Sequence, residues 1–192
     1  MQAAIEKPLL KVGDHPMIYH VICALKNAES VNRLIVAVTP ATRNTAETVH
    51  DLGVEVFETA GEGYEQDMKQ AIKTLGLEDV VIVAADLPFL APVIIDVAVQ
   101  NYFLNDKPAL MVAAPIELYE RLGLKASYAF NYEGKDLVPV GLNVIDGTRI
   151  DEGRLDETIF VVTDRDLIFN VNTQADLKLA RNYQGRWPRD EA

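Results

Sequence analysis

The sequence predicts an α/β fold in which a mostly parallel sheet carries helices on both faces. Short apolar runs of the kind buried in parallel sheets recur through the first two thirds of the chain, for example Leu34–Val38 and Val80–Ala84. Segments with apolar residues at helical spacing separate these runs. Such regular alternation is typical of sheets whose parallel strands are connected by helices.

The individual elements of this part follow from the same periodicity. The segment Met17–Lys26 places four aliphatic side chains on one helical face. Gly76 is a suitable residue to end the third helix, and Pro92 a suitable residue to begin the fourth. We expect strands over residues 1–5, 34–38, 54–57, 80–84 and 109–114, and helices over 17–26, 44–52, 64–75 and 92–105.

The last third is mixed and is expected to cover one end of the sheet. We expect a short helix over 118–122, strands over 128–132, 136–145, 160–164 and 168–173, and a final helix over 173–183. Glu133-Gly134-Lys135 suits a hairpin turn, and Thr173 suits the cap of the final helix. Residues 1–184 are therefore expected to form a single domain, followed by a polar tail over 185–192.

Composition narrows the classes of function. The 192 residues carry a net charge of −11, which argues against a nucleic-acid-binding surface. No apolar run is long enough to span a bilayer and no signal peptide is evident, so no membrane partner and a cytoplasmic location are expected. A polyanionic ligand would have to be held by backbone N–H groups, a few lysines and a divalent cation.

Two charged residues are the first candidates for chemistry. In open α/β sheets, ligands lie beyond the carboxyl ends of the strands. Asp86 follows a buried strand there and is well placed to hold Mg²⁺, although it would equally suit a cap of the following turn. Lys7 follows the first expected strand and could contact phosphate, or it could be an ordinary surface lysine.

Glycines and asparagines supply further candidates. Gly61 and Gly63 stand between a strand and a helix, where they could bring free N–H groups to a ligand or merely form a turn. Gly141 and Asn143 interrupt an apolar strand, which suggests a close approach or a bulge.

Two asparagines end an expected strand. Asn170 and Asn172 are spaced to point to one side of it. One of them could complete a metal site or contact a ribose, and the alternative is capping of the last helix.

Taken together, these segments resemble one family. The segments are Glu6-Lys7-Pro8-Leu9, Thr39-Pro40, Gly61-Glu62-Gly63-Tyr64, Ala85-Asp86-Leu87, Val138 to Val144 and Phe169 to Thr173. They are similar to archaeal GTP:adenosylcobinamide-phosphate guanylyltransferases, which belong to the nucleotidyltransferase superfamily that includes molybdenum-cofactor guanylyltransferase. The resemblance implies a Rossmann-like fold of the GT-A-like nucleotidyltransferase type.

The resemblance also implies an activity: transfer of GMP from GTP to the corrinoid adenosylcobinamide phosphate, with release of pyrophosphate, in cobalamin biosynthesis. An acceptor such as molybdopterin or a sugar phosphate, or a non-catalytic nucleotide-binding domain, remains an alternative. The partners would be small molecules, and a homodimer through the late strands is compatible with the resemblance.

The resemblance implies roles for particular residues. Asp86 would hold Mg²⁺, with Asn170 or Asn172 as the second group beside the metal, and Lys7 would face phosphate. Thr39, Gly61 and Gly63 would line the nucleotide pocket, and Gly141 and Asn143 would border the acceptor or the ribose.

One family feature is missing. Family members carry a loop like A-G-G-x-G-x-R-M between the first strand and the K-P-L-L segment, whereas Ile5 here abuts Glu6. The loop could be left out of the structure with the numbering closed over the gap, it could be deleted, or the gene start could be misassigned. The first explanation is favoured because a Gly-rich loop is readily disordered without its nucleotide.

Overall fold

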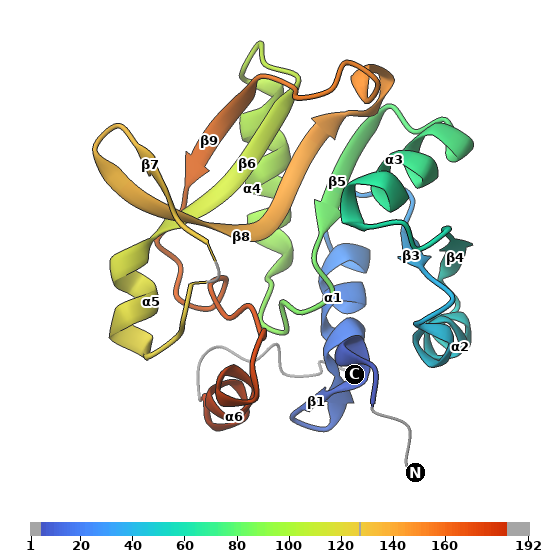
Figure 1. Cartoon of the computed structure of the whole chain (residues 1–192), viewed down its shortest axis with the longest axis horizontal. Coiled ribbons are helices and arrows are strands. Elements are labelled where there is room, and N and C mark those ends of the chain that lie inside the picture. Colours follow the sequence, from blue (N-terminus) through green and yellow to red (C-terminus); the bar gives the residue numbers. More distant parts are fainter. Residues whose placement is uncertain (1–4, 127, 184–192) are drawn as a thin grey trace.

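The structure is a computed structural model that describes residues 5–126 and 128–183. Its main sheet has the strand order β5-β8-β6-β9, and β7 pairs with β8 beyond this path (Figure 1). These strands are β5 (Asp79–Val83), β6 (Ala109–Pro115), β7 (Phe130–Tyr132), β8 (Lys135–Asp146) and β9 (Glu157–Val161). Because β8 is antiparallel to β5, β6 and β7 while β9 is parallel to β6, the described strands of this sheet all share one direction except β8. The expected α/β fold with a mixed, mostly parallel sheet is confirmed.

Helices pack against both sides of the molecule. Helix α4 (Pro92–Phe103) covers one face of the main sheet, where Ile95 and Ala98 are fully buried. Figure 1 shows α4 behind β6 and β8, and α3 (Tyr64–Leu75) beside β5. The remaining helices are α1 (Met17–Lys26), α2 (Arg43–Asp51), α5 (Ile116–Leu122) and α6 (Gln174–Asn182), with short 3₁₀ helices η1 (Lys7–Leu9) and η2 (Gly147–Arg149). No helix in the described part of the chain combines the length and hydropathy needed to cross a membrane.

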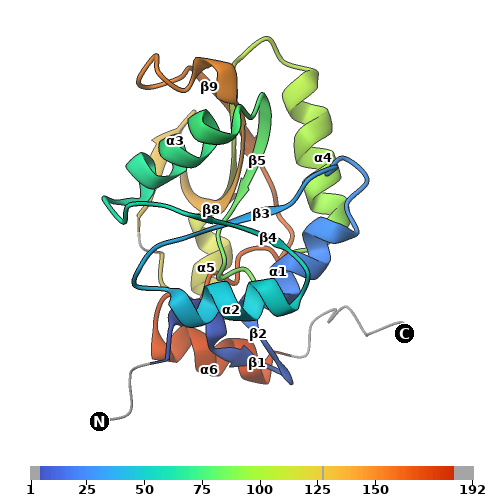
Figure 2. The same cartoon turned by 90° about the vertical axis from the view of Figure 1, so that its right-hand side faces the viewer.

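The first half of the chain forms a second, smaller sheet. Strands β3 (Ile35–Val38) and β4 (Glu55–Glu58) are parallel and are connected by α2. No ladder of hydrogen bonds joins β3 to β5 in the part of the chain that the structure describes. Figure 2 shows β3 and β4 running across β5 instead of extending its sheet. A hairpin of β1 (Lys11–Val12) and β2 (His15–Pro16) precedes α1.

The expected first strand is absent where it can be assessed. Ile5 is 69% exposed and lies outside any strand, so that expectation is wrong at this residue. Residues 1–4 lie outside the described residues, as does the expected tail over 185–192. The full sequence joins Ile5 directly to Glu6. The favoured explanation of the missing loop, a segment left out with the numbering closed over it, is therefore wrong.

The late elements differ most from expectation. The strand expected over 160–164 is β9, which lies at 157–161. The strand expected over 168–173 is wrong, because this segment is a turn followed by irregular chain. Its apolar residues Ile168 and Phe169 are instead buried in the main core, which explains the strand-like hydropathy. The hairpin turn and the cap at Thr173 are confirmed.

Candidate functional site

A short strap leads the chain over the carboxyl ends of β3 and β5. The strap, residues 6–10, contains η1, in which Pro8 occupies the first turn and Leu9 N–H donates to the Glu6 carbonyl at 2.9 Å. Leu9 packs against the small apolar cluster formed by α1, α2 and β4. The strap is thereby fixed at the edge of the sheet where ligands of α/β proteins are expected.

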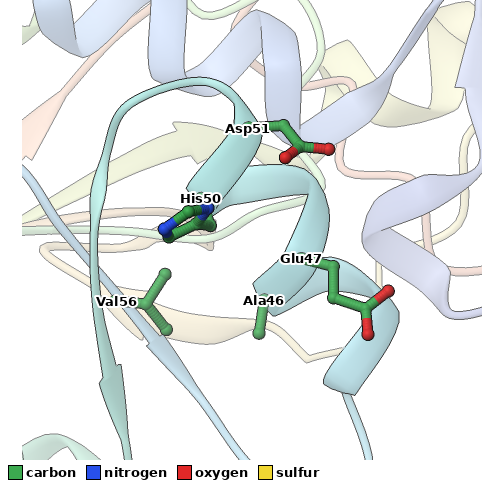
Figure 3. Close-up of a pocket in the computed structure, with 5 residues that line it drawn as sticks. All are labelled: Ala46, Glu47, His50, Asp51 and Val56. Atoms are coloured by element: carbon green, nitrogen blue, oxygen red, sulfur yellow. The ribbon is translucent and has the colours of Figure 1, made fainter.

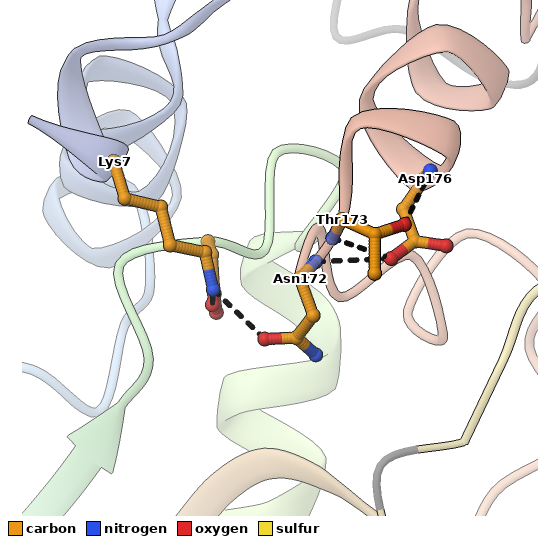
Figure 4. Close-up of polar contacts among 5 residues, drawn as sticks. Lys7, Asn172, Thr173 and Asp176 are labelled. Carbon is orange, nitrogen blue, oxygen red and sulfur yellow. Dashed lines mark hydrogen bonds and ion pairs between the residues drawn. The ribbon is translucent and has the colours of Figure 1, made fainter. Parts of the chain in front are cut away.

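Lys7 projects from this strap into a polar cluster. Its ammonium group donates to Asp86 Oδ2 and, at 2.8 Å, to Asn172 Oδ1. Figure 4 shows Lys7 reaching towards Asn172, which immediately precedes the first turns of α6. The Lys7 side chain is 41% exposed and that of Asp86 only 15% exposed, so the pair lies at a surface with its carboxylate on the inner side. Lys7 and Asp86, the first two candidates for chemistry, are therefore in direct contact.

Helix α6 holds the asparagine end of the cluster. Thr173 Oγ1 accepts from Asp176 N–H, and Asp176 Oδ2 accepts from Thr173 N–H at 2.8 Å, which completes a capping box. The same carboxylate oxygen accepts from Asn172 N–H at 3.2 Å. Val171 N–H donates to the Asp86 carbonyl at 3.1 Å, so the segment before α6 is attached directly to the end of β5. The side chain that caps α6 in this box is that of Thr173.

Two oxygen atoms of this cluster lack hydrogen-bond partners. Asp86 Oδ1 and Asn170 Oδ1 are buried, and neither makes a hydrogen bond among the residues described. A buried polar atom without a partner is costly, and a cation is a suitable partner for a carboxylate or amide oxygen. No group of three or more His, Cys, Asp or Glu side chains that could hold a metal occurs within the described ranges. The oxygen-only donors fit Mg²⁺, which commonly uses one or two carboxylates together with substrate phosphates.

Gly141 makes room for Asn170 and for the end of β5. It has φ +87°, and a Cβ placed on it would lie 2.9 Å from Ala84 Cβ and 3.5 Å from Asn170 Nδ2. Ala84 N–H also donates to the Gly141 carbonyl at 2.8 Å. The close approach expected at Gly141 is thus made by the protein's own chain. Asn143 lies two residues further along β8, paired with Ile82 and Met111 inside the sheet.

The glycine loop before α3 is already hydrogen-bonded to its own helix. Asp67 Oδ1 accepts from the N–H groups of Gly61 at 2.8 Å and Glu62 at 3.2 Å. The expectation of a free N–H group at Gly61 is therefore wrong. A Cβ on Gly61 would lie 3.6 Å from Thr39 Cβ, so these two residues adjoin one another as expected. Gly63 is the residue before the first turn of α3.

Two residues beside this cluster were missed by the sequence interpretation. Tyr64 begins α3, and its side chain remains 65% exposed. Loss of water around its hydroxyl, and then the negative charge of Asp86, raise the pKa of Tyr64 above its usual value, which places the phenol within electrostatic range of that carboxylate. Glu6 binds the start of α2 through four hydrogen bonds. The segments Glu6-Lys7 and Gly63-Tyr64 were signals for both.

A separate depression lies on the outer side of α2. Its volume is about 350 Å³, and its lining residues are Ala46, Glu47, His50, Asp51 and Val56 (Figure 3). None of the expected site residues lines it. The arrangement at Lys7, Asp86 and the two asparagines, with its charges and orphaned oxygens, is the better candidate for a functional site.

Comparison with known proteins identifies the family of this chain. The MobA-like NTP transferase domain matches residues 1–133. The chain is 33% identical over 186 residues to an adenosylcobinamide-phosphate guanylyltransferase of Methanocaldococcus jannaschii, covering 92% of this chain and 87% of that protein. It is 26% identical to a probable molybdenum cofactor guanylyltransferase of Thermococcus kodakarensis, covering 90% and 85%.

Solved structures share the fold at low sequence identity. A CMP:2-keto-3-deoxy-manno-octonic acid synthetase complexed with CTP has a TM-score of 0.69 and 15% identity, covering 92% of this chain and 90% of that chain. A putative glucose-1-phosphate thymidylyltransferase from Bacillus anthracis has a TM-score of 0.64 and 16% identity, covering 92% and 87%. With the domain match over more than half of its length, this chain belongs to the MobA-like NTP transferase family and is a nucleotidyltransferase.

Proposed function

We propose that this chain transfers GMP from GTP to adenosylcobinamide phosphate and releases pyrophosphate. The observation that carries the proposal is the cluster in which Lys7 meets Asp86 and Asn172, beside two buried oxygens that lack partners among the described residues. The identity of 33% to a corrinoid guanylyltransferase, against 26% to a molybdenum-cofactor relative, supports the corrinoid acceptor.

The reaction needs charge neutralisation and alignment and no covalent group from the protein. An oxygen of the acceptor phosphate attacks the α-phosphorus of GTP, the bond to the bridging α–β oxygen breaks, and pyrophosphate leaves with the electron pair. Asp86, with Asn170 or Asn172, would hold Mg²⁺, which supplies charge stabilisation to the phosphate oxygens. Lys7 would exchange part of its contact with Asp86 for a phosphate oxygen, because both are anionic partners for one ammonium group.

The nucleotide would lie over the strap side of the sheet. We propose that Thr39, Gly61 and Gly63 border the nucleotide and that Gly141 and Asn143 border the acceptor side. Because Gly61 and Glu62 donate to Asp67, the loop would contribute its shape and side-chain positions more than free amides. The Tyr64 hydroxyl is protonated at neutral pH, as in any tyrosine whose pKa is not lowered, so it could donate a hydrogen bond near Asp86.

A second candidate function is nucleotide binding without turnover. It is favoured by the direct join of Ile5 to Glu6, which leaves out the Gly- and Arg-rich loop that the family resemblance implies. The occupied amides of Gly61 and Glu62 remove another set of donors for phosphate.

Two measurements separate these functions. Calorimetric titration with GTP and Mg²⁺ measures binding, and a coupled pyrophosphate assay with adenosylcobinamide phosphate measures transfer. Pyrophosphate release that depends on this acceptor supports the guanylyltransferase, whereas binding without release supports the second candidate. Release only with molybdopterin or a sugar phosphate would reassign the acceptor.

A single substitution tests the site itself. We expect Asp86→Ala to abolish transfer and to leave the thermal melt nearly unchanged. The variant loses an ion pair whose lysine is 41% exposed, but it also removes the buried Oδ1, which has no partner among the described residues. Asp14→Ala, at an exposed position in the turn between β1 and β2, is the matched control and should retain full activity. Transfer by Asp86→Ala would remove this carboxylate from the metal role.

Location and assembly are part of the proposal. We propose a cytoplasmic enzyme that forms a homodimer through the late strands, where the outer edge of β9 has no partner strand among the described residues. Light scattering of the purified chain measures the assembly state directly.

A further inference from the structure

We infer that Glu6 is a positioning residue, which aims Lys7 at Asp86 and Asn172 by anchoring the strap to the first turn of α2. The inference rests on the proposed function for its catalytic consequence, and on contacts of the described residues for its geometry. The hydrogen bonds that Glu6 makes are to Asn44 and Thr45 and do not involve Asp86, Asn170 or Asn172. Its effect would therefore pass through the neighbouring lysine.

The carboxylate of Glu6 is fully engaged. Oε1 accepts from Asn44 N–H at 3.0 Å and from its side-chain Nδ2 at 2.7 Å. Oε2 accepts from Thr45 N–H at 2.8 Å and from its hydroxyl at 2.6 Å. Although partial burial opposes ionisation, these hydrogen bonds hold the pKa of Glu6 below its ordinary value. The side chain is thus ionised and anchored at neutral pH.

This arrangement replaces an ordinary helix cap. Helix α2 begins at Arg43, so Asn44 and Thr45 carry the second and third N–H groups of the helix, which a local cap would normally satisfy. The local residue Thr42 makes no such hydrogen bond with its side chain. A carboxylate 38 positions earlier in the sequence supplies the cap instead, and the positive end of the helix dipole favours its charge.

The anchor transmits its position to Lys7 through a stiff piece of chain. Glu6 is extended, with φ −60° and ψ 136°, and η1 begins at the next residue with Pro8 in its first turn. The two neighbouring side chains consequently bind partners that follow different strands. Glu6 binds α2, which follows β3, and Lys7 binds Asp86, which follows β5. Because no strand pairing joins β3 to β5 in the described chain, this pair of contacts is a polar link across the break in the sheet.

The test uses an isosteric variant and a matched control. Glu6→Gln keeps the shape of the side chain but turns one acceptor into a donor that faces donors on α2. Glu47→Gln removes one exposed carboxylate from the same helix and controls for net charge. We expect Glu6→Gln to lower kcat/KM about tenfold, the effect of losing charge-assisted hydrogen bonds. Glu47→Gln should match the parent protein.

A double variant separates a positioning role of Glu6 from a general loss of structure. If Glu6 acts through Lys7, then Glu6→Gln has no further effect on transfer once Lys7→Ala is present. Additive losses in the double variant would overturn the inference. Thr45→Val, which removes only the hydroxyl donor to Oε2, should lower kcat/KM in the same direction by a smaller factor.

A readout without catalysis keeps the inference separate from the proposed function. Acetylation of individual lysines by acetic anhydride, followed by mass spectrometry, reports how far each amine is released from its partners. We expect Lys7 to be modified several times faster in Glu6→Gln, whereas Lys26, which donates to the Leu52 carbonyl, should be unchanged. Unchanged labelling of Lys7 would overturn the positioning role even if transfer is confirmed. Faster labelling in a chain without transferase activity would preserve it while the proposed function fails.

Discussion

Gly141 offers a quantitative test of how the end of β5 and the asparagine segment are held together. In Gly141→Ala, the new methyl group would lie 2.9 Å from Ala84 Cβ, closer than carbon atoms pack. The backbone also has φ +87°, where side chains with a Cβ are unfavourable. Both effects act on one position, so the free energy of unfolding should fall.

A control glycine separates the steric and the backbone contributions to the loss of unfolding free energy. Gly53 has φ +66°, and no atom of the described residues would lie within 4 Å of a methyl group added there, so Gly53→Ala carries only the backbone cost, about 1–2 kcal/mol. Overpacking adds about 1–3 kcal/mol at Gly141, which gives about 2–5 kcal/mol in total. In a chain of this size, each kcal/mol corresponds to about 2–4 °C in Tm.

Chemical denaturation of the two variants is the appropriate assay. We expect Gly141→Ala to lose more stability than Gly53→Ala by the overpacking cost. We also expect weaker GTP binding, because Ala84, two residues before Asp86, would have to move away from the added methyl group. Equal losses of stability in the two variants would refute the close approach of β8 to Ala84.

Three other expectations concern charged groups. Asp86→Asn, which retains one oxygen donor, should keep the fold and lose Mg²⁺-dependent GTP binding in calorimetry; undiminished binding would contradict a metal at this carboxylate. Hydrogen bonds from Lys69 and then Lys73 lower the pKa of Asp151 from 3.8 to about 2. Its stabilising contribution is therefore fully present above about pH 4 and disappears as the pH falls towards 2. The melting temperatures of Asp151→Asn and of the parent protein should differ slightly at neutral pH and converge in acid. High salt should reduce the difference at neutral pH. Asp67→Ala should free the amides before α3 and increase hydrogen exchange there, and unchanged exchange would show that the carboxylate does not hold this loop.

Periodicity determined the local elements because it reflects short-range physics. Apolar residues at helical spacing predicted α1 and α3 with the bounds that the structure has. Continuous aliphatic runs predicted β5 and β6 to within one residue, although β6 is largely buried and β5 is only partly buried. The same reasoning failed at Ile168 and Phe169, which lie in an irregular segment but are buried in the main core.

Lys7 reaches the cluster from η1 and not from the end of the strand expected before it. Sequence position did place Asp86 beyond the carboxyl end of β5, as the structure has it. It could not show that Lys7 donates to Asp86 and Asn172, which are 79 and 165 positions away. It equally missed the anchor of Glu6 on α2, because a cap supplied from 38 positions away leaves no local pattern. The break between β3 and β5 is also a tertiary feature. The residues of a strand are the same whether or not it pairs with its neighbour, so its sequence does not reveal the break.

The sequence by itself thus determined most of the helices and strands and the position of Asp86 after β5, since both depend on residue spacing and chain direction. Only the tertiary structure decided which polar groups meet there. Those contacts depend on how separate elements pack in three dimensions, and no short stretch of sequence encodes that packing.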